Sequence, residues 1–152
     1  MNRIVLDTCV VTTALRNATG AGNAVLRLVA QGQLTPLVTP ALFLEYEEVL
    51  KRPEQRIVTG FSLAEVDAFL NALASAGEAV DVNFFWRPQL RDPSDEMVFE
   101  TAINGRADAL LTYNLRDFQP AAQRFSIRII TPSEFLTAFS SSAATAPKEI
   151  HR

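Results

Sequence analysis

Short apolar runs alternate along the chain with longer segments in which apolar residues recur at helical spacing. The short runs are typical of buried strands, and the longer segments are typical of helices that pack one face on a core. Strands are predicted at residues 3–7, 36–40 and 107–114, with a further short strand at 78–82 and a last one at the start of 126–139. Helices are predicted at 21–32, 40–52, 62–77 and 93–105, and at the end of 126–139.

Residues that favour helix ends support three of these helices. A side-chain oxygen just before a helix satisfies its free backbone N–H groups, and proline fits the first helical position. The start signals are Thr39 before Pro40, the capping box of Ser62 and Glu65, and Asp92 before Pro93, whose helix is expected to stop at Gly105.

The alternation of strands with helices predicts the fold class directly. It is an α/β fold, a doubly wound parallel sheet with helices on both faces, or α/β/α sandwich. Sites in such sheets form at the carboxyl ends of strands, near a switch in strand order. Asp7, Thr112 and Asn114 are predicted at such ends.

The length and composition are those of one compact domain. The chain has 152 residues, 48% of them hydrophobic, so we expect a single domain over residues 1–139 and a disordered polar tail over 140–152. Cys9 is the only cysteine, which excludes an internal disulfide, and no signal peptide or membrane-spanning run is recognised. These features predict a cytoplasmic protein.

The charge of the chain excludes binding of nucleic acid by bulk electrostatics alone. The formal net charge is -3, whereas such binding requires a basic protein. Twelve of the fourteen basic residues are arginines, with Lys51 and Lys148 the exceptions. This bias has two readings, a GC-rich genome or the use of arginine as a bidentate phosphate ligand.

Acidic residues crowd the start of the helix predicted at 93–105. Residues three and four apart share a helix face, so Asp95 shares its face with the apolar stripe of Val98, Phe99 and Ala102. Asp95 is therefore expected to point inward, toward a site. By the same spacing Glu96 and Glu100 are expected to be solvated. Asp92 is favoured as the helix cap.

Two other segments contribute candidate carboxylates. Asp7 ends a buried strand, where an unpaired ionised carboxylate is costly. In the helix at 40–52, Glu45 and Glu47 lie on faces of nearly equal apolarity, and spacing alone leaves the choice between them open.

Convergent carboxylates require a cation, because they cannot all ionise at close range without one. Oxygen ligands favour Mg²⁺ or Mn²⁺ over zinc. Since His151 is the only histidine and Cys9 the only cysteine, zinc sites and histidine-based acid–base chemistry are excluded. The chemistry that remains is attack on a phosphoryl or similar centre by a metal-activated water.

The segments "VLDTCV", "TPALFLEYEEVLKRP", "RDPSDEMVFETAINGRADALLTYNLRDF" and "IRIITPSEFL", in this order and spacing, resemble the PIN-domain family. Within it the chain is most similar to VapC-like toxin ribonucleases of bacterial toxin–antitoxin pairs. The resemblance covers residues 1 to about 139. It implies a doubly wound sandwich with an acidic Mg²⁺/Mn²⁺ site that cleaves RNA, a small antitoxin protein as partner and a possible homodimer.

Carried over by position, the resemblance also implies roles for individual residues. It implies the following assignments: Asp7, Glu45 and Asp95 as the catalytic and metal-binding acids, Asn114 or Asp117 as the group completing the metal site, and Thr8, Asp92 and Thr112 in support. Two positions depart from the family pattern. Cys9 stands where Asn or Ser is usual, and Asn114 stands where a fourth acid often lies, with Asp117 following three residues later.

Two phosphotransfer folds are excluded, and one alternative stays open. A receiver module needs a lysine near its last strand, and the segment "SIRIITPSEF" contains none. An aspartyl phosphatase needs a second aspartate at position 9, which is cysteine here. The remaining alternative is a PIN-like protein with weak or no catalysis that binds RNA or a protein partner, and Asn114 is the residue that supports it.

Overall fold

The computed structural model describes residues 2–83, 90 and 92–145 of the chain. Over these residues it contains five strands and eight helices. In chain order they are β1 (Arg3–Leu6), α1 (Thr8–Arg16), α2 (Ala21–Ala30), β2 (Thr35–Val38), α3 (Pro40–Leu50), α4 (Pro53–Thr59), α5 (Leu63–Ala76), β3 (Glu78–Ala79), α6 (Pro93–Gly105), β4 (Ala109–Leu111), α7 (Leu115–Phe125), β5 (Ile129–Ile130) and α8 (Pro132–Thr145).

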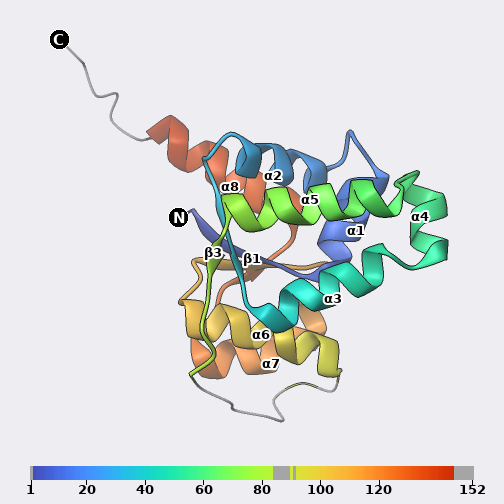
Figure 1. The fold of residues 1–152 in the computed structure, drawn as a ribbon. Helices are drawn as coiled ribbons and strands as arrows, with labels where there is room; N and C mark the ends of the chain where they lie inside the picture. Colours follow the sequence, from blue (N-terminus) through green and yellow to red (C-terminus); the bar gives the residue numbers. More distant parts are fainter. Residues whose placement is uncertain (1, 84–89, 91, 146–152) are drawn as a thin grey trace.

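All strand pairs in the sheet are parallel, and the strand order is β3-β2-β1-β4-β5. Figure 1 shows α2, α5 and α8 on one face of the sheet and α6 and α7 on the other. The predicted α/β/α class is therefore confirmed. The chain leaves β1 toward β2 and β3, then returns to place β4 on the opposite side of β1. This switch in direction lies between β1 and β4, where a site is expected.

The centre of the sheet is buried on both faces. Ile4 and Val5 of β1 and Leu110 and Leu111 of β4 have no exposed surface, as expected for parallel strands covered by helices on both sides. On α6, the predicted apolar stripe is buried, and Phe99 meets Phe125 of α7 edge to face with ring centroids 5.5 Å apart. This packing holds α6 against the neighbouring helix α7.

The predicted helix starts are confirmed. Thr39 Oγ1 accepts a hydrogen bond from the Leu42 N–H at 3.1 Å. Ser62 and Glu65 form the reciprocal capping box, with bonds of 3.1 and 3.2 Å. The caps therefore place the beginnings of α3 and α5 where the sequence predicts them.

The end of α6 differs in detail from the expected glycine stop. Gly105 is the last helical residue, and the left-handed turn falls on Arg106, with φ 51°. A Cβ atom on Gly105 would lie 2.8 Å from Leu37 Cδ1 and 3.0 Å from Val80 Cγ2. A side chain at this position would displace the side chains of Leu37 and Val80, so glycine lets α6 pack closely on the sheet.

Three helices were not predicted from the hydrophobic pattern, namely α1, α4 and α7. The α1 segment is rich in valine and threonine, which have low helix propensity, and α7 contains Pro120. In both helices buried side chains supply the stability that propensity does not. At the other end of the chain, α8 continues through Thr145, past the domain boundary expected at residue 139, and residues 146–152 lie outside the described part.

No single helix in the described residues is long and apolar enough to cross a membrane. Helices α4 and α5 meet the length and composition criterion only as a pair, and this pair is bent by 82° at its break.

Candidate active site

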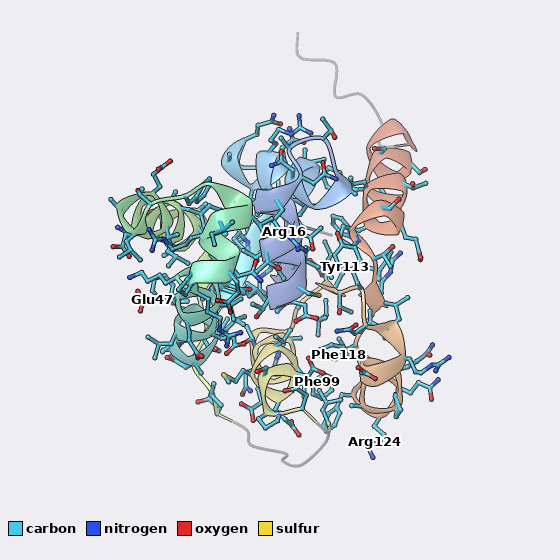
Figure 2. All side chains as sticks on the ribbon, turned by 90° about the vertical axis from the view of Figure 1, so that its right-hand side faces the viewer. Arg16, Glu47, Phe99, Tyr113, Phe118 and Arg124 are labelled. Atoms are coloured by element: carbon cyan, nitrogen blue, oxygen red, sulfur yellow. The ribbon has the colours of Figure 1, made fainter. Side chains whose placement is uncertain are left out.

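The candidate site lies at the switch point, where β1 and β4 end side by side. The Asp7 N–H donates to the Leu111 carbonyl at 2.9 Å, which ties the two strand ends together. Thr112 follows β4 directly and is fully buried. Figure 2 turns this end of the molecule, where β1 passes into α1, toward the viewer.

The Asp7 carboxylate is held by one of its two oxygens. Its Oδ2 accepts hydrogen bonds from Thr112 Oγ1 at 2.6 Å and from Cys9 Sγ at 3.2 Å. Thr112 Oγ1 in turn accepts from the Asn114 N–H at 2.9 Å. Asp7 Oδ1 accepts no hydrogen bond from the described residues. Asp7 also stands at the N-terminus of α1, where the helix dipole favours a negative charge. The carboxylate is thus fixed in orientation and keeps one oxygen available for a ligand.

Cys9 and Tyr46 support the site in ways that the sequence analysis did not identify. Burial, and next the nearby charge of Asp7, raise the pKa of Cys9 to about 12, so its thiol stays protonated and can donate to Asp7. The Tyr46 hydroxyl donates to the carbonyl of Leu6, the residue before Asp7. A buried tyrosine hydroxyl needs a hydrogen-bond partner. A tyrosine in the apolar face of the helix was therefore the sequence signal that could have identified Tyr46.

Asp95 points inward from the first turn of α6, as predicted, with 9% of its surface exposed. Burial, and after it the charges of Asp7, Asp92 and Asp117 in that order, raise the pKa of Asp95 to about 7. These carboxylates come from the end of β1 and from the starts of α6 and α7. The site therefore concentrates negative charge from three separate parts of the chain.

Asp92 is the N-cap of α6, as predicted, and its Oδ1 accepts from the Ser94 N–H at 2.9 Å. The prediction that Glu96 and Glu100 are solvated is wrong, because both are buried, at 4% and 5% exposure. Glu96 Oε1 accepts from the Leu90 N–H at 2.8 Å. Spacing along α6 identified its sheet-facing side correctly but could not reveal a contact such as that of Leu90 with Glu96 on another side of the helix.

Asn114 and Asp117 lie at the start of α7. The helix begins at Leu115, and the Asp117 N–H donates to the Asn114 carbonyl at 3.1 Å. The helical turn that brings positions 114 and 117 to one side is therefore present. Both side chains are exposed, and the charge of Asp117 reaches Asp95.

Glu45 is half-buried on α3, one residue before Tyr46. It makes no hydrogen bond or ion pair with the described residues, and its charge acts on Arg52. Glu47, the alternative at the sequence level, pairs instead with Lys51 at 3.4 Å. The charge of Glu47 is thus engaged at the surface. Among the described residues, the Glu45 carboxylate has no such partner, and it forms no hydrogen bond with Asp7 or Asp95.

The residues at this site fit a hard divalent cation that keeps part of its water shell. Their donors are carboxylate, amide and hydroxyl oxygens, and Thr8 Oγ1 is buried without a hydrogen-bond partner in the described structure. Within the same residues, no three Asp, Glu, His or Cys side chains are grouped closely enough to hold an ion by themselves. Mg²⁺ is commonly bound by only one or two carboxylates together with several waters, which is compatible with this spacing.

Comparison with known proteins adds one finding. A family model described as "PIN domain" matches residues 3–116, about three quarters of the chain. The match includes Asp7, Asp95 and Asn114 and ends one residue before Asp117. A search of curated proteins found no match.

Proposed function

The chain belongs to the PIN-domain family, and on that premise we propose that it is a Mg²⁺- or Mn²⁺-dependent endoribonuclease. PIN domains are generally nucleases and usually use divalent metals. The observation that carries the proposal is that the charges of Asp7 and Asp117 both act on the buried Asp95 beside the strand switch point, where no lysine or arginine of the described chain pairs with any of the three. Such a charge excess favours binding of a cation.

We assign Asp7, Glu45 and Asp95 to the cation, with Asn114 and Asp117 as further candidate ligands. When bound, the ion supplies positive charge that activates water and stabilises the charge of the reacting phosphodiester. Thr112 and Cys9 hold Asp7 Oδ2 so that Oδ1 faces the ligand. Asp95 gives up its proton on cation binding, and Asp92 keeps the first turn of α6, and so Asp95, in position.

Cleavage of RNA by the purified full-length protein tests this proposal. We expect a single-stranded RNA to be cut in the presence of Mn²⁺ and left intact when EDTA replaces the metal. An equivalent DNA strand serves as the control for substrate class. The alternative of a PIN-like binding protein, which the neutral Asn114 favours, predicts RNA retention without cleavage under both conditions. That result would reject the nuclease assignment.

A separate prediction concerns Asn114 and Asp117. An amide oxygen can ligate a hard cation but contributes no charge, so we expect Asn114→Asp to lower the Mn²⁺ concentration needed for half-maximal cleavage. Asp117→Asn should raise that concentration, because it removes a charge that reaches Asp95. Titration of cleavage with Mn²⁺ measures both shifts. If Asp117→Asn titrates like the wild type, Asp117 is a surface residue of α7 and not a ligand.

We further propose that the enzyme is the cytoplasmic toxin of a toxin–antitoxin pair, on the resemblance of its four segments to VapC-like ribonucleases. Its partner would then be a small protein that places a basic or aromatic side chain in the acidic site, and the toxin could act as a homodimer. Expression of the chain alone in bacteria should arrest growth, and Asp95→Asn should abolish the arrest. Harmless expression of an active enzyme would indicate a housekeeping ribonuclease instead.

A further inference from the structure

An aromatic ring stands at the rim of the acidic site. Tyr113 lies between Thr112, which is fully buried against Asp7, and Asn114. Its side chain is 44% exposed, and it is the only aromatic residue among the large hydrophobic side chains that the described structure leaves exposed. The ring is therefore attached to a rigid part of the site and is available to a ligand.

An arginine lies close to this ring. Figure 2 shows Arg16 and Tyr113 together near the centre of the site end of the molecule. Burial raises the pKa of the Tyr113 phenol and the positive charge of Arg16 lowers it, so the Arg16 guanidinium lies near the Tyr113 ring. Arg16 is in the last turn of α1, and its Nη2 donates to Thr13 Oγ1 at 3.2 Å.

The guanidinium of Arg16 is available for an anion. In the described part of the chain it forms no ion pair, whereas Arg3, Lys51 and Arg52 are each paired with a carboxylate. The protein carries a net charge of -3, and its site is acidic, so long-range electrostatics repel a polyanion. A phosphodiester therefore needs a local cation at the rim, and arginine can bind phosphate through two parallel hydrogen bonds.

We propose that Tyr113 and Arg16 form a nucleotide-binding subsite beside the acidic site, in which an unpaired base stacks on the Tyr113 ring and Arg16 binds a neighbouring phosphate. The inference rests on the proposed nuclease function and specifies its substrate as single-stranded nucleic acid, because a base held in a duplex cannot leave its stack to meet the ring without losing its pairing. Stacking on one aromatic ring tolerates any base, so the subsite selects strandedness and not sequence.

Steady-state cleavage of a fluorescein-labelled single-stranded RNA of about twelve nucleotides, with Mn²⁺, tests the subsite. Loss of one base–aromatic stack weakens binding by roughly tenfold or more, so Tyr113→Ala should raise KM by about that factor and leave kcat nearly unchanged. Tyr113→Phe keeps the ring and should resemble the wild type, while Tyr113→Leu keeps only apolar bulk and should resemble Tyr113→Ala. A wild-type KM for Tyr113→Ala, or for Tyr113→Leu, would overturn the stacking role.

Arg16→Ala should also raise KM, and it should reduce the slope of log KM against log salt by about one, as expected for loss of a single phosphate contact. Arg124→Ala is the matched control, because Arg124 is exposed in the last turn of α7 and Figure 2 shows it well away from Arg16 and Tyr113. An unchanged salt slope in Arg16→Ala overturns the phosphate contact.

The two levels of the proposal fail in different ways. If the wild type cleaves RNA and the Tyr113 and Arg16 variants keep its KM, the subsite is wrong and the nuclease function stands. If the wild type neither cleaves nor, by fluorescence anisotropy in EDTA, binds the RNA, both are wrong. The same anisotropy measurement compares the affinity of the protein for the single-stranded RNA and for its blunt-ended duplex. Equal affinities would overturn the assignment of a single-stranded substrate.

Discussion

Replacing Asp95 with asparagine should reduce RNA cleavage by roughly 10²- to 10³-fold or more, the range seen when a preorganised electrostatic group is removed from an active site. Asp95 is buried and inward-facing, and burial together with the charges of Asp7, Asp92 and Asp117 raises its pKa to about 7. The amide keeps the shape of the side chain but cannot carry the charge that a divalent cation needs. Cleavage rates of purified wild type and Asp95→Asn under saturating Mn²⁺ measure the effect.

Asp7→Asn should cause a loss of similar size, because it removes the carboxylate oriented by Thr112 and Cys9. Asp108→Asn is the matched control. Asp108 lies at the opposite end of β4, where it accepts from the Arg3 N–H, a bond that asparagine can also accept. Each variant must show a cooperative melting transition like that of the wild type. Wild-type cleavage by folded Asp95→Asn protein would remove Asp95 from the site.

Mn²⁺ should raise the melting temperature of the wild type by about 5 to 10 °C at a hundredfold excess over its dissociation constant. A ligand that binds only the folded state contributes about 2.7 kcal/mol at that excess, and each kcal/mol shifts the melting temperature of a domain of this size by about 2 to 4 °C. The cation also relieves the repulsion among Asp7, Asp95 and Asp117. Thermal melts with and without Mn²⁺, in the wild type and in Asp7→Asn, measure this shift, which should be largely lost in the variant.

This stabilisation should depend on pH through Asp95. Its pKa is raised from 3.8 to about 7 in the folded protein, so the folded state holds the proton more tightly than the unfolded state does. Metal-free stability is therefore expected to fall as the pH rises from about 4 to 7. Because the cation must displace this proton, the Mn²⁺ shift should be larger at pH 8 than at pH 5. In EDTA, Asp95→Asn should lose this pH dependence, and an equal slope in both proteins would contradict the raised pKa of Asp95.

Local pattern predicted a large part of the fold. The alternation of apolar runs with helical segments was sufficient for the parallel α/β class, and the signals at Thr39 and Ser62 marked helix starts correctly. Pattern also placed Asp7 at a strand end and Asp95 at the head of a buried stripe. These features are accessible from sequence because a strand end and a helix face depend only on residues within a few positions of one another.

Other features depended on what packs against each element. The α1 and α7 segments have unfavourable helix composition and are helical because they bury one side in the tertiary structure. Glu96 and Glu100 are buried against the expectation from spacing, and Glu96 accepts a hydrogen bond from the N–H of Leu90, which precedes α6. The family resemblance, rather than spacing, singled out Glu45, and its role in the metal site remains a prediction.

The sequence by itself determined which carboxylates were available and toward which side of their own elements they point, since helical and strand periodicity are local properties. Only the tertiary structure decided which of them meet. The hydrogen bond from Thr112 to Asp7 joins residues 105 positions apart, and the charges on Asp95 come from Asp7, Asp92 and Asp117 on three elements. Such contacts arise from the order of strands in the sheet, and that order is set by packing of the whole chain and not by any segment of it.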